Sequence, residues 1–193
     1  MARPQSFERS TVLSQALRVF WSKGYNDASI QDLVDATGLN RGSLYNSFGD
    51  KAELFAEVMR LYVSQSPTQL LIIAPEDANA HHLFTNFFQA LVDRARSDPD
   101  HKGCLMTNTA AGFYGCSAAM SESVRDSLAG MEVLFVKLIS QGQHRGEIST
   151  QIEPLKLARF FVSAALGINV FARTHADESV LQDIVDVTLH ALN

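Results

Sequence analysis

The chain has 193 residues, of which 46% are hydrophobic and 19% charged, so one or two domains can bury a sizeable core. Its formal net charge of −5 argues against a protein that coats nucleic acid without sequence preference. Two cysteines are too few for a secreted disulfide framework, and we identify neither a signal-type N-terminus nor an apolar run that approaches the length of a membrane span. We therefore expect a cytoplasmic protein that does not engage membranes.

The first predicted element is an amphipathic helix over residues 7–23, whose apolar side chains follow the i, i+3, i+4 spacing of one buried stripe. Gly24 should end this helix, because glycine takes a left-handed conformation without a steric penalty. Ser29 then stands where an N-cap belongs, and Asp32 follows three residues later. This pair predicts a capping box at the start of a second helix.

Gly38 should turn the chain into a third helix, which Asn40 can cap. This helix must be short, since Gly49 and Asp50 interrupt it within about three turns. Asp50 can cap a fourth helix in its turn. Three short helices with a glycine-centred turn before the third are the layout that offers one helix to the major groove of DNA.

The third helix has two different faces. Leu44 and Phe48 lie four residues apart, so both should dock the helix on its neighbours. The opposite face carries small or polar residues: Arg41, Gly42, Ser43, Asn46 and Ser47. Because arginine favours guanine and asparagine favours adenine through paired hydrogen bonds, this face is a candidate for reading base edges. Tyr45 and Lys51 are placed to reach phosphates.

Specific motifs span the segment from Phe20 to Leu54. They are the aromatic-x-x-x-Gly-Tyr that ends the first helix, the Ser-Ile-x-x-Leu-Val of the second, and Gly-Leu-x-Arg-Gly-Ser-Leu-Tyr-x-x-Phe through the third, followed by Lys51 and Leu54. This segment resembles the DNA-binding head of the tetracycline-repressor (TetR/AcrR) family. The rest of the chain matches that family only in length and helical rhythm.

The resemblance implies DNA contacts at the start of the second helix and in and after the third: Ser29, Gln31, Arg41, Gly42, Ser43, Tyr45, Asn46 and Lys51. Asn46 stands where many members have an aromatic residue or a histidine, so we predict no operator sequence. The resemblance further implies a DNA-binding domain at residues 1–50 and a ligand-binding and dimerisation domain at residues 51–193. It also implies a repressor that a small-molecule effector releases from a palindromic operator in double-stranded DNA.

Charge is divided unevenly along the chain. Residues 1–60 hold seven Lys or Arg and seven Asp or Glu, whereas residues 61–193 hold nine and fourteen and carry the whole net charge. The head is therefore neutral, but we expect its cations to lie where phosphates would be met: Arg3, Arg9, Arg41 and Lys51. With few phosphate contacts in each head, useful affinity should need a dimer.

The remaining sequence is helical in rhythm, with expected helices at about 80–97, 103–113, 117–141, 155–171 and 178–192. We predict an all-α fold of about nine helices, with an N-terminal three-helix helix-turn-helix head and a C-terminal helical bundle. Segment 155–171 is apolar round most of its circumference, which is typical of a helix buried on more than one side. We expect this helix and the last one to pair with their two-fold mates in a homodimer.

The expected dimer interface comprises Phe160, Ala164, Gly167, Phe171, Leu181, Ile184, Val185 and Thr188. The alternative is a monomer in which the last helix covers its neighbour. A cavity for the unknown effector could be lined by aromatic, thiol and small polar residues: Phe84, Phe87, Phe88, Cys104, Thr107, Asn108, Phe113 and Phe135. The alternative for each aromatic residue is a place in the ordinary core.

Cys104 supports a second hypothesis about regulation. It follows Lys102 and Gly103 near a predicted helix N-terminus, and both features favour the reactive thiolate. A repressor that senses oxidants or electrophiles through Cys104 is therefore an alternative, with Cys116 as a conceivable resolving thiol. The simpler interpretation is a small buried apolar residue.

We identify no motif that predicts an enzyme, a cofactor or a metal site. The six histidines form no metal-binding pattern, and neither a nucleophile elbow, a phosphate loop nor a dinucleotide fingerprint is present. A Cys104–His101 pair is conceivable as a nucleophile and base, but such a pair is generic. An all-helical interaction module that does not bind DNA remains the alternative of another class.

Overall fold

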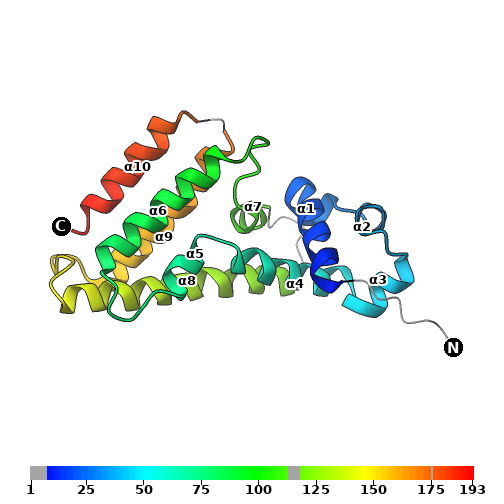
Figure 1. Ribbon diagram of the computed structural model, residues 1–193, viewed down its shortest axis with the longest axis horizontal. Coiled ribbons are helices and arrows are strands. Elements are labelled where there is room, and N and C mark those ends of the chain that lie inside the picture. The colour runs from blue at the N-terminus through cyan, green and yellow to red at the C-terminus, as the bar shows by residue number, and fades with distance from the viewer. Residues whose placement is uncertain (1–7, 113–117, 175) are drawn as a thin grey trace.

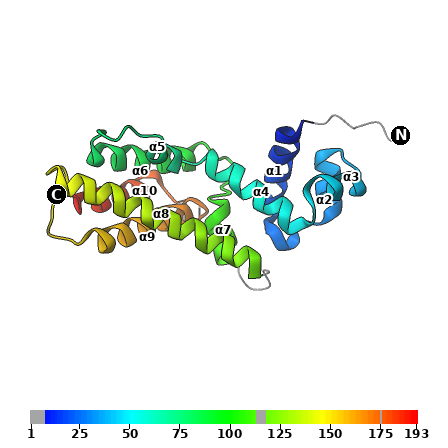
Figure 2. The same ribbon diagram turned by 90° about the horizontal axis from the view of Figure 1, so that it is seen from below.

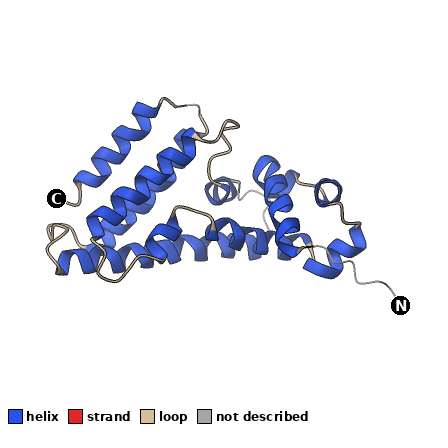
Figure 3. Cartoon of the chain, viewed as in Figure 1, coloured by secondary structure: helices blue, strands red, loops and turns tan. Residues whose placement is uncertain are grey.

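The computed structural model describes residues 8–112, 118–174 and 176–193. These residues form ten helices and no strand (Figure 3), so the expected all-α fold is confirmed. The count exceeds the expected nine because a short helix, α5 (Thr68–Ile72), follows Pro67. The molecule is elongated, with α1–α3 at one end and the C-terminus at the other (Figures 1 and 2).

The head is built from α1 (Arg9–Asp27), α2 (Ile30–Thr37) and α3 (Arg41–Phe48), and α4 (Lys51–Ser64) leads from it into the body. Gly24 interrupts the helical backbone of α1 with φ 77° and ψ 168°, a conformation that costs other residues steric strain. The first helix thus breaks where the sequence predicts, although one further turn continues to Asp27.

Side chains cap the next three helices as the sequence predicts. The Ser29 hydroxyl accepts from the Asp32 amide, and the Asp32 carboxylate accepts from the Ser29 amide, which completes the capping box of α2. Asn40 Oδ1 accepts from the Ser43 amide at the start of α3. A second capping box joins Asp50 and Glu53 at the start of α4. These caps fix where α3 begins and ends.

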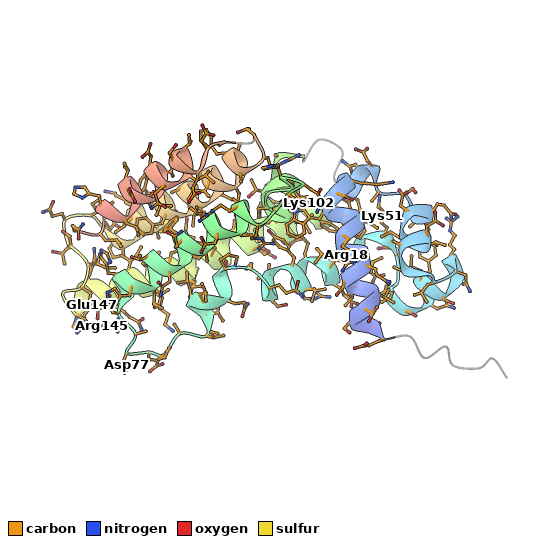
Figure 4. All side chains as sticks on the ribbon, turned by 45° about the horizontal axis from the view of Figure 1, so that its top comes forward. Arg18, Lys51, Asp77, Lys102, Arg145 and Glu147 are labelled. Carbon is orange, nitrogen blue, oxygen red and sulfur yellow. The ribbon has the colours of Figure 1, made fainter. Side chains whose placement is uncertain are left out.

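The body contains α6 (Ala80–Arg96), α7 (Leu105–Ala111), α8 (Ala118–His144), α9 (Pro154–Ala172) and α10 (Glu178–His190). Figure 1 shows α8 running lengthwise through the body, where it contacts α4 and α5, while α6, α9 and α10 lie together at the end away from the head. Arg145 and Glu147, which follow α8, join it to the start of α6 (Figure 4). Arg145 donates to the carbonyls of Glu76 and Ala78, and Glu147 accepts from the Ala80 amide.

Two groups of buried side chains hold the fold together. One fills the body between α6, α8, α9 and α10, with edge-to-face contacts of Phe84 to Phe135 and Phe161 at centroid distances of 5.3 and 5.0 Å. The other begins in the head and extends through α4 to Leu105, Met106 and Val124 in α7 and α8. The second group therefore crosses the domain boundary predicted at residues 50 and 51.

Helix α9 corrects the expectation that no apolar segment approaches the length of a membrane span. Among the described helices it alone is long and apolar enough to cross a membrane, with a mean hydropathy of 1.5 over 18 residues. One side of it is packed into the body through residues such as Phe161 and Ala165, so the length and composition are weak evidence for a span. Its other side leaves Phe160 and Phe171 exposed.

Candidate nucleic-acid interface and effector cavity

The outer face of α3 is open. Leu44 and Phe48 are buried against the rest of the head, whereas Arg41, Gly42 and Asn46 are exposed on the opposite side. Ser43, Tyr45 and Ser47 are half-buried at the edges of this face, and the Arg41 guanidinium lies 5.6 Å from the Tyr45 ring centre. The two faces of α3 thus divide as its sequence predicts, with the polar groups directed outward.

The predicted contacts at the start of α2 already have partners within the head. Ser29 is exposed, but its hydroxyl takes part in the capping box with Asp32. The exposed Gln31 donates from Nε2 to Asp35 Oδ1 at 2.7 Å. A phosphate at this end of α2 could still meet free amide hydrogens, because the first turn of any helix leaves such donors unpaired.

Lys51 lies at the start of α4, beside the head (Figure 4), with its ammonium 4.3 Å from the Tyr25 ring centre. Burial lowers the pKa of this ammonium group, and the nearby Asp27 carboxylate opposes that effect. The cation is thus held over an aromatic face rather than extended freely into solvent. The Lys51 ammonium can contact a phosphate in one of two ways. Either the side chain leaves the Tyr25 ring, or the DNA backbone passes on the side of the head where Tyr25 lies.

Arg9 has a different place from the one expected. Its guanidinium donates to the Ser47 carbonyl at 2.8 Å, pairs with Glu57 at 2.6 Å and stacks on Phe48 at 4.2 Å. It therefore joins α1 to α3 and α4, and Arg9 belongs to α1 rather than to an N-terminal arm. A phosphate contact of Arg9 stays a prediction. Arg3 and the rest of that arm lie outside the described residues.

The residues predicted for a dimer interface divide between the surface and the core. Phe160 and Phe171 are 45% and 44% exposed, and nothing lies within 4 Å of where a Cβ on Gly167 would be. Ala164 and Ile184 are half-buried at the margin. Leu181, Val185 and Thr188, in contrast, are buried within the chain, where α10 packs against α6 and α9. The exposed side of α10 is instead marked by Val187.

A cavity of about 360 Å³ lies in the body, between α4, α5, α6, α7, α8 and α9. Most of its lining is apolar, including Phe87, Leu91, Met106, Met131 and Leu134. Polar groups enter from several sides: Tyr62, Ser66, Thr68, Arg94, Cys104, Ser127 and Asn169. A largely apolar cavity with a few polar groups is typical of small-molecule sites.

Of the residues predicted to bind the effector that the structure describes, only Phe87 and Cys104 line this cavity. Phe84, Phe88 and Phe135 are fully buried in the body core, because their edge-to-face contacts with one another and with Phe161 occupy the interior. These three residues are therefore ordinary core residues, which was the alternative stated for each aromatic residue.

The predicted polar groups of α7 also lie elsewhere. Thr107 is buried, and its hydroxyl is without a hydrogen-bond partner among the described residues. Asn108 donates to the Lys102 carbonyl and accepts from Arg173, which ties the α6–α7 loop to α9. Phe113 lies outside the described residues.

Sequence reasoning missed three residues that meet at the head-facing side of the cavity: Trp21 of α1, Tyr62 of α4 and Arg94 of α6. The Arg94 guanidinium lies 4.9 Å from the Trp21 ring centre and 4.8 Å from that of Tyr62. The two rings meet edge to face at 5.3 Å. One signal was available, because Phe87, Leu91 and Arg94 follow one helical stripe and place a cation on an otherwise apolar face.

Burial raises the pKa of the Tyr62 hydroxyl far above its usual range, with the neighbouring Cys104 adding to the effect. The phenol is therefore neutral, and its polar neighbours are Cys104 and the Leu105 backbone. Cys104 itself is half-buried and caps α7, where its Sγ accepts from the Thr107 amide at 3.5 Å. Among the described residues, no group of three His, Cys, Asp or Glu side chains could hold a metal ion.

Comparisons with known proteins agree with this architecture. The family model for bacterial regulatory proteins of the tetR family matches residues 12–58. The model for the tetracyclin repressor-like C-terminal domain matches residues 84–187, which is more than half of the chain. The fold and these matches are those of a transcriptional regulator rather than an enzyme.

Relatives match over nearly the whole length. The HTH-type transcriptional repressor ComR of Escherichia coli K12 is 29% identical over 191 residues, which cover 97% of this chain and 90% of the relative. YezE of Bacillus subtilis 168, an uncharacterized HTH-type transcriptional regulator, is 26% identical over 194 residues and the full length of both proteins.

Solved structures show the same fold. A cysteine mutant of the TetR-family regulator CifR, complexed with 26-base-pair operator DNA, superposes with a TM-score of 0.87 at 28% identity over 99% of this chain and all of that one. The reduced form of E. coli NemR superposes with a TM-score of 0.85 at 19% identity over 96% of each chain, a likeness of fold alone.

Proposed function

The chain belongs to the tetracycline-repressor family of DNA-binding transcriptional repressors, and from that premise we propose that it acts as a cytoplasmic homodimer that a small molecule releases from a palindromic operator. The observation that carries the proposal is the exposed polar face of α3, with Leu44 and Phe48 anchoring the opposite face in the head core. A helix held in this way can enter a major groove without unfolding its own support.

In the proposed complex, Arg41 and Asn46 read base edges, while Tyr45 and Lys51 set the register on the phosphates. Gly42 lets the backbone approach the duplex, since it is exposed and has only the Asn40 side chain nearby. Two heads related by a two-fold axis would bind half-sites about one helical turn apart, or a multiple of that spacing. The exposed apolar side of α9, with Phe160 and Phe171, is the surface we assign to the two-fold contact.

The experiment that tests DNA reading starts from selection of binding sites out of a random duplex library, because the operator is unknown. We expect enrichment of one palindrome. Arg41→Ala should then weaken binding to the selected site by about 1–3 kcal/mol and relax preference at one position of each half-site. Tyr45→Ala should weaken binding to all sequences alike, because a phosphate contact carries no base information.

Lys137→Ala is the matched control for the loss of a charge, since Lys137 is exposed on α8 of the body rather than in the head. It should leave binding unchanged. A library from which the folded protein enriches no sequence would contradict the proposal and favour an interaction module that does not bind DNA.

A thiol-based release mechanism is a second candidate, and one observation favours it: Cys104 lines the cavity, where Tyr62 is its neighbour. An electrophile entering the cavity would therefore meet this thiol. Modification should be tested in a Cys116→Ser protein, so that Cys104 is the only thiol. Unchanged operator affinity after complete alkylation of Cys104 would exclude this mechanism.

A further inference from the structure

Arg94 occupies a position between the cavity and the head. It lies near the end of α6 and is half-buried, and its guanidinium faces the rings of Trp21 from α1 and Tyr62 from α4. Trp21 is the only tryptophan of the chain, and its Nε1 donates to the Gly103 carbonyl at 3.1 Å. Arg94 is thus part of a contact through which the first helix of the head is held against the body.

No carboxylate neutralises this guanidinium within the described part of the chain. The ion pairs found there involve other residues, and Arg96, two positions further on, pairs with Glu178 at 3.1 Å. Asp98 lines the adjoining groove with Arg94, but its carboxylate accepts from the backbone amides of Lys102 and Gly103 instead. Arg94 is therefore a half-buried cation whose partners in the protein are aromatic faces.

The surroundings of Arg94 select the chemistry of a binding partner. Among the described residues that line the cavity, Arg94 is the one charged residue, and the others are apolar or neutral. A half-buried cation without an anionic partner is costly, and an arginine fork matches a carboxylate through two parallel hydrogen bonds. A neutral apolar ligand would fill the cavity but leave the Arg94 guanidinium without an anionic partner.

From these observations we propose that the effector is an apolar molecule bearing one carboxylate, with the carboxylate on Arg94 and the apolar body among Phe87, Met131 and Leu134. This inference rests on the proposed function and specifies the ligand of the same cavity. The carboxylate neutralises the guanidinium, so the attraction of Arg94 to the faces of Trp21 and Tyr62 weakens. The contact between α6 and α1 then loosens, which gives the ligand different affinities for the two head positions, as release from DNA requires.

The first test compares decanoate with 1-decanol and decylamine on the unmodified protein, because the three share a chain and differ in the charge of the head group. Binding is followed by calorimetry and by the emission of Trp21, the only indole present. We expect decanoate to bind about tenfold or more tightly than decanol, as a charge-assisted hydrogen bond would give. The emission of Trp21 should change with decanoate and stay nearly constant with decanol.

The second test removes the cation. Arg94→Met keeps the length of the side chain and should abolish the preference for decanoate over decanol. Arg96→Met is the matched control on the same helix and should keep the preference, since Arg96 lies outside the cavity lining. Thermal unfolding establishes that each variant folds, and if Arg94→Met does not, the ligand series on the unmodified protein still decides.

Equal binding of decanoate and decanol, or failure of all three to bind, would overturn the carboxylate inference. So would an unchanged preference in folded Arg94→Met. Operator release distinguishes these failures from failure of the proposed function. If decanol also displaces the protein from its selected DNA site, the cavity is an effector site with another ligand class. If decanoate binds at Arg94 without altering DNA affinity, the inferred coupling of the cavity to the head is wrong.

Discussion

At the scale of single residues, the turn between α1 and α2 is stabilised by a compact set of polar contacts. The Asp32 carboxylate accepts from Lys23 at 2.6 Å and from the Ser29 amide and hydroxyl. The Lys23 hydrogen bond, followed by those from Ser29, lowers the pKa of Asp32 from 3.8 to about 2. The folded head therefore favours the ionised carboxylate more than the unfolded chain does.

This lowered pKa predicts a dependence of stability on pH. The contribution of Asp32 should be complete above about pH 4, near its ordinary pKa, and be lost as the pH falls toward 2. Titration of the Asp32 carboxyl by NMR checks the value directly. Lys23→Met should raise the pKa toward 3.8, while Lys137→Met, which removes a remote exposed charge, should leave it unchanged. An Asp32 pKa near 3.8 in the original protein would contradict this account.

Alanine substitution of two glycines in the head should change the free energy of unfolding in opposite directions. Gly49 has φ 75°, and a Cβ there would lie 1.7 Å from Glu53 Oε2. Gly49→Ala should therefore lower the free energy of unfolding by about 1–3 kcal/mol, since it strains the backbone and disturbs the capping box of α4. Gly42 is helical and open, so Gly42→Ala should raise the free energy of unfolding by up to about 1 kcal/mol.

Urea denaturation measures both changes. DNA binding then separates stability from function, because Gly42→Ala should weaken operator binding although the protein becomes more stable. If Gly42→Ala left operator affinity intact, close approach of the α3 backbone to the duplex would be excluded.

At the scale of helices, aromatic residues that lie in similar apolar helical sequences can have different environments. Phe84 of α6 is fully buried and meets Phe135 and Phe161 edge to face, whereas Phe160 of α9 is 45% exposed. The sequence shows both as apolar residues on helices and cannot distinguish them, since burial depends on which neighbouring helix each faces. For the same reason it assigned Phe84, Phe88 and Phe135 to the cavity, and Leu181, Val185 and Thr188 to the dimer surface.

A pair of substitutions measures this difference. Phe84→Ala should lower the free energy of unfolding by about 3–5 kcal/mol, because it leaves a void among the rings. Phe160→Ala is the matched control, and its effect on unfolding should be small when the protein is dilute enough to be monomeric. Similar losses from both substitutions would mean that the body core is arranged differently.

The head could be predicted in more detail than the body. Its helix boundaries follow from local signals, namely the caps Ser29, Asn40 and Asp50, which act on backbone amides within three residues. The role of Arg9 and the cluster of Trp21 with Arg94 could not be predicted in this way. They depend on contacts between residues far apart in the chain, which no local pattern encodes. Helix α5 was missed because its five residues are too few for a hydrophobic period.

At the scale of the whole molecule, the proposed dimer should depend on the outer side of α9. Phe171→Glu places a charge on a surface that is 44% exposed in one chain, so the isolated chain should still fold. The dimer should dissociate, because burying an unpaired carboxylate at an interface is unfavourable. Sedimentation measures the change in mass, and operator affinity should fall in parallel because the second head is lost.

Val133→Glu is the control, since Val133 is an exposed apolar residue of α8 rather than α9. A Phe171→Glu protein that sediments as the original does would exclude α9 as the centre of the interface.

The group of buried side chains that begins in the head extends beyond the first four helices. Leu54, Phe55 and Val58 share it with Leu105 and Met106, which come from the middle of the chain. Truncation after residue 64 would uncover this apolar surface to water. Exchange of DNA-recognition segments between related regulators would therefore succeed only if the residues of α7 that face them are transferred as well.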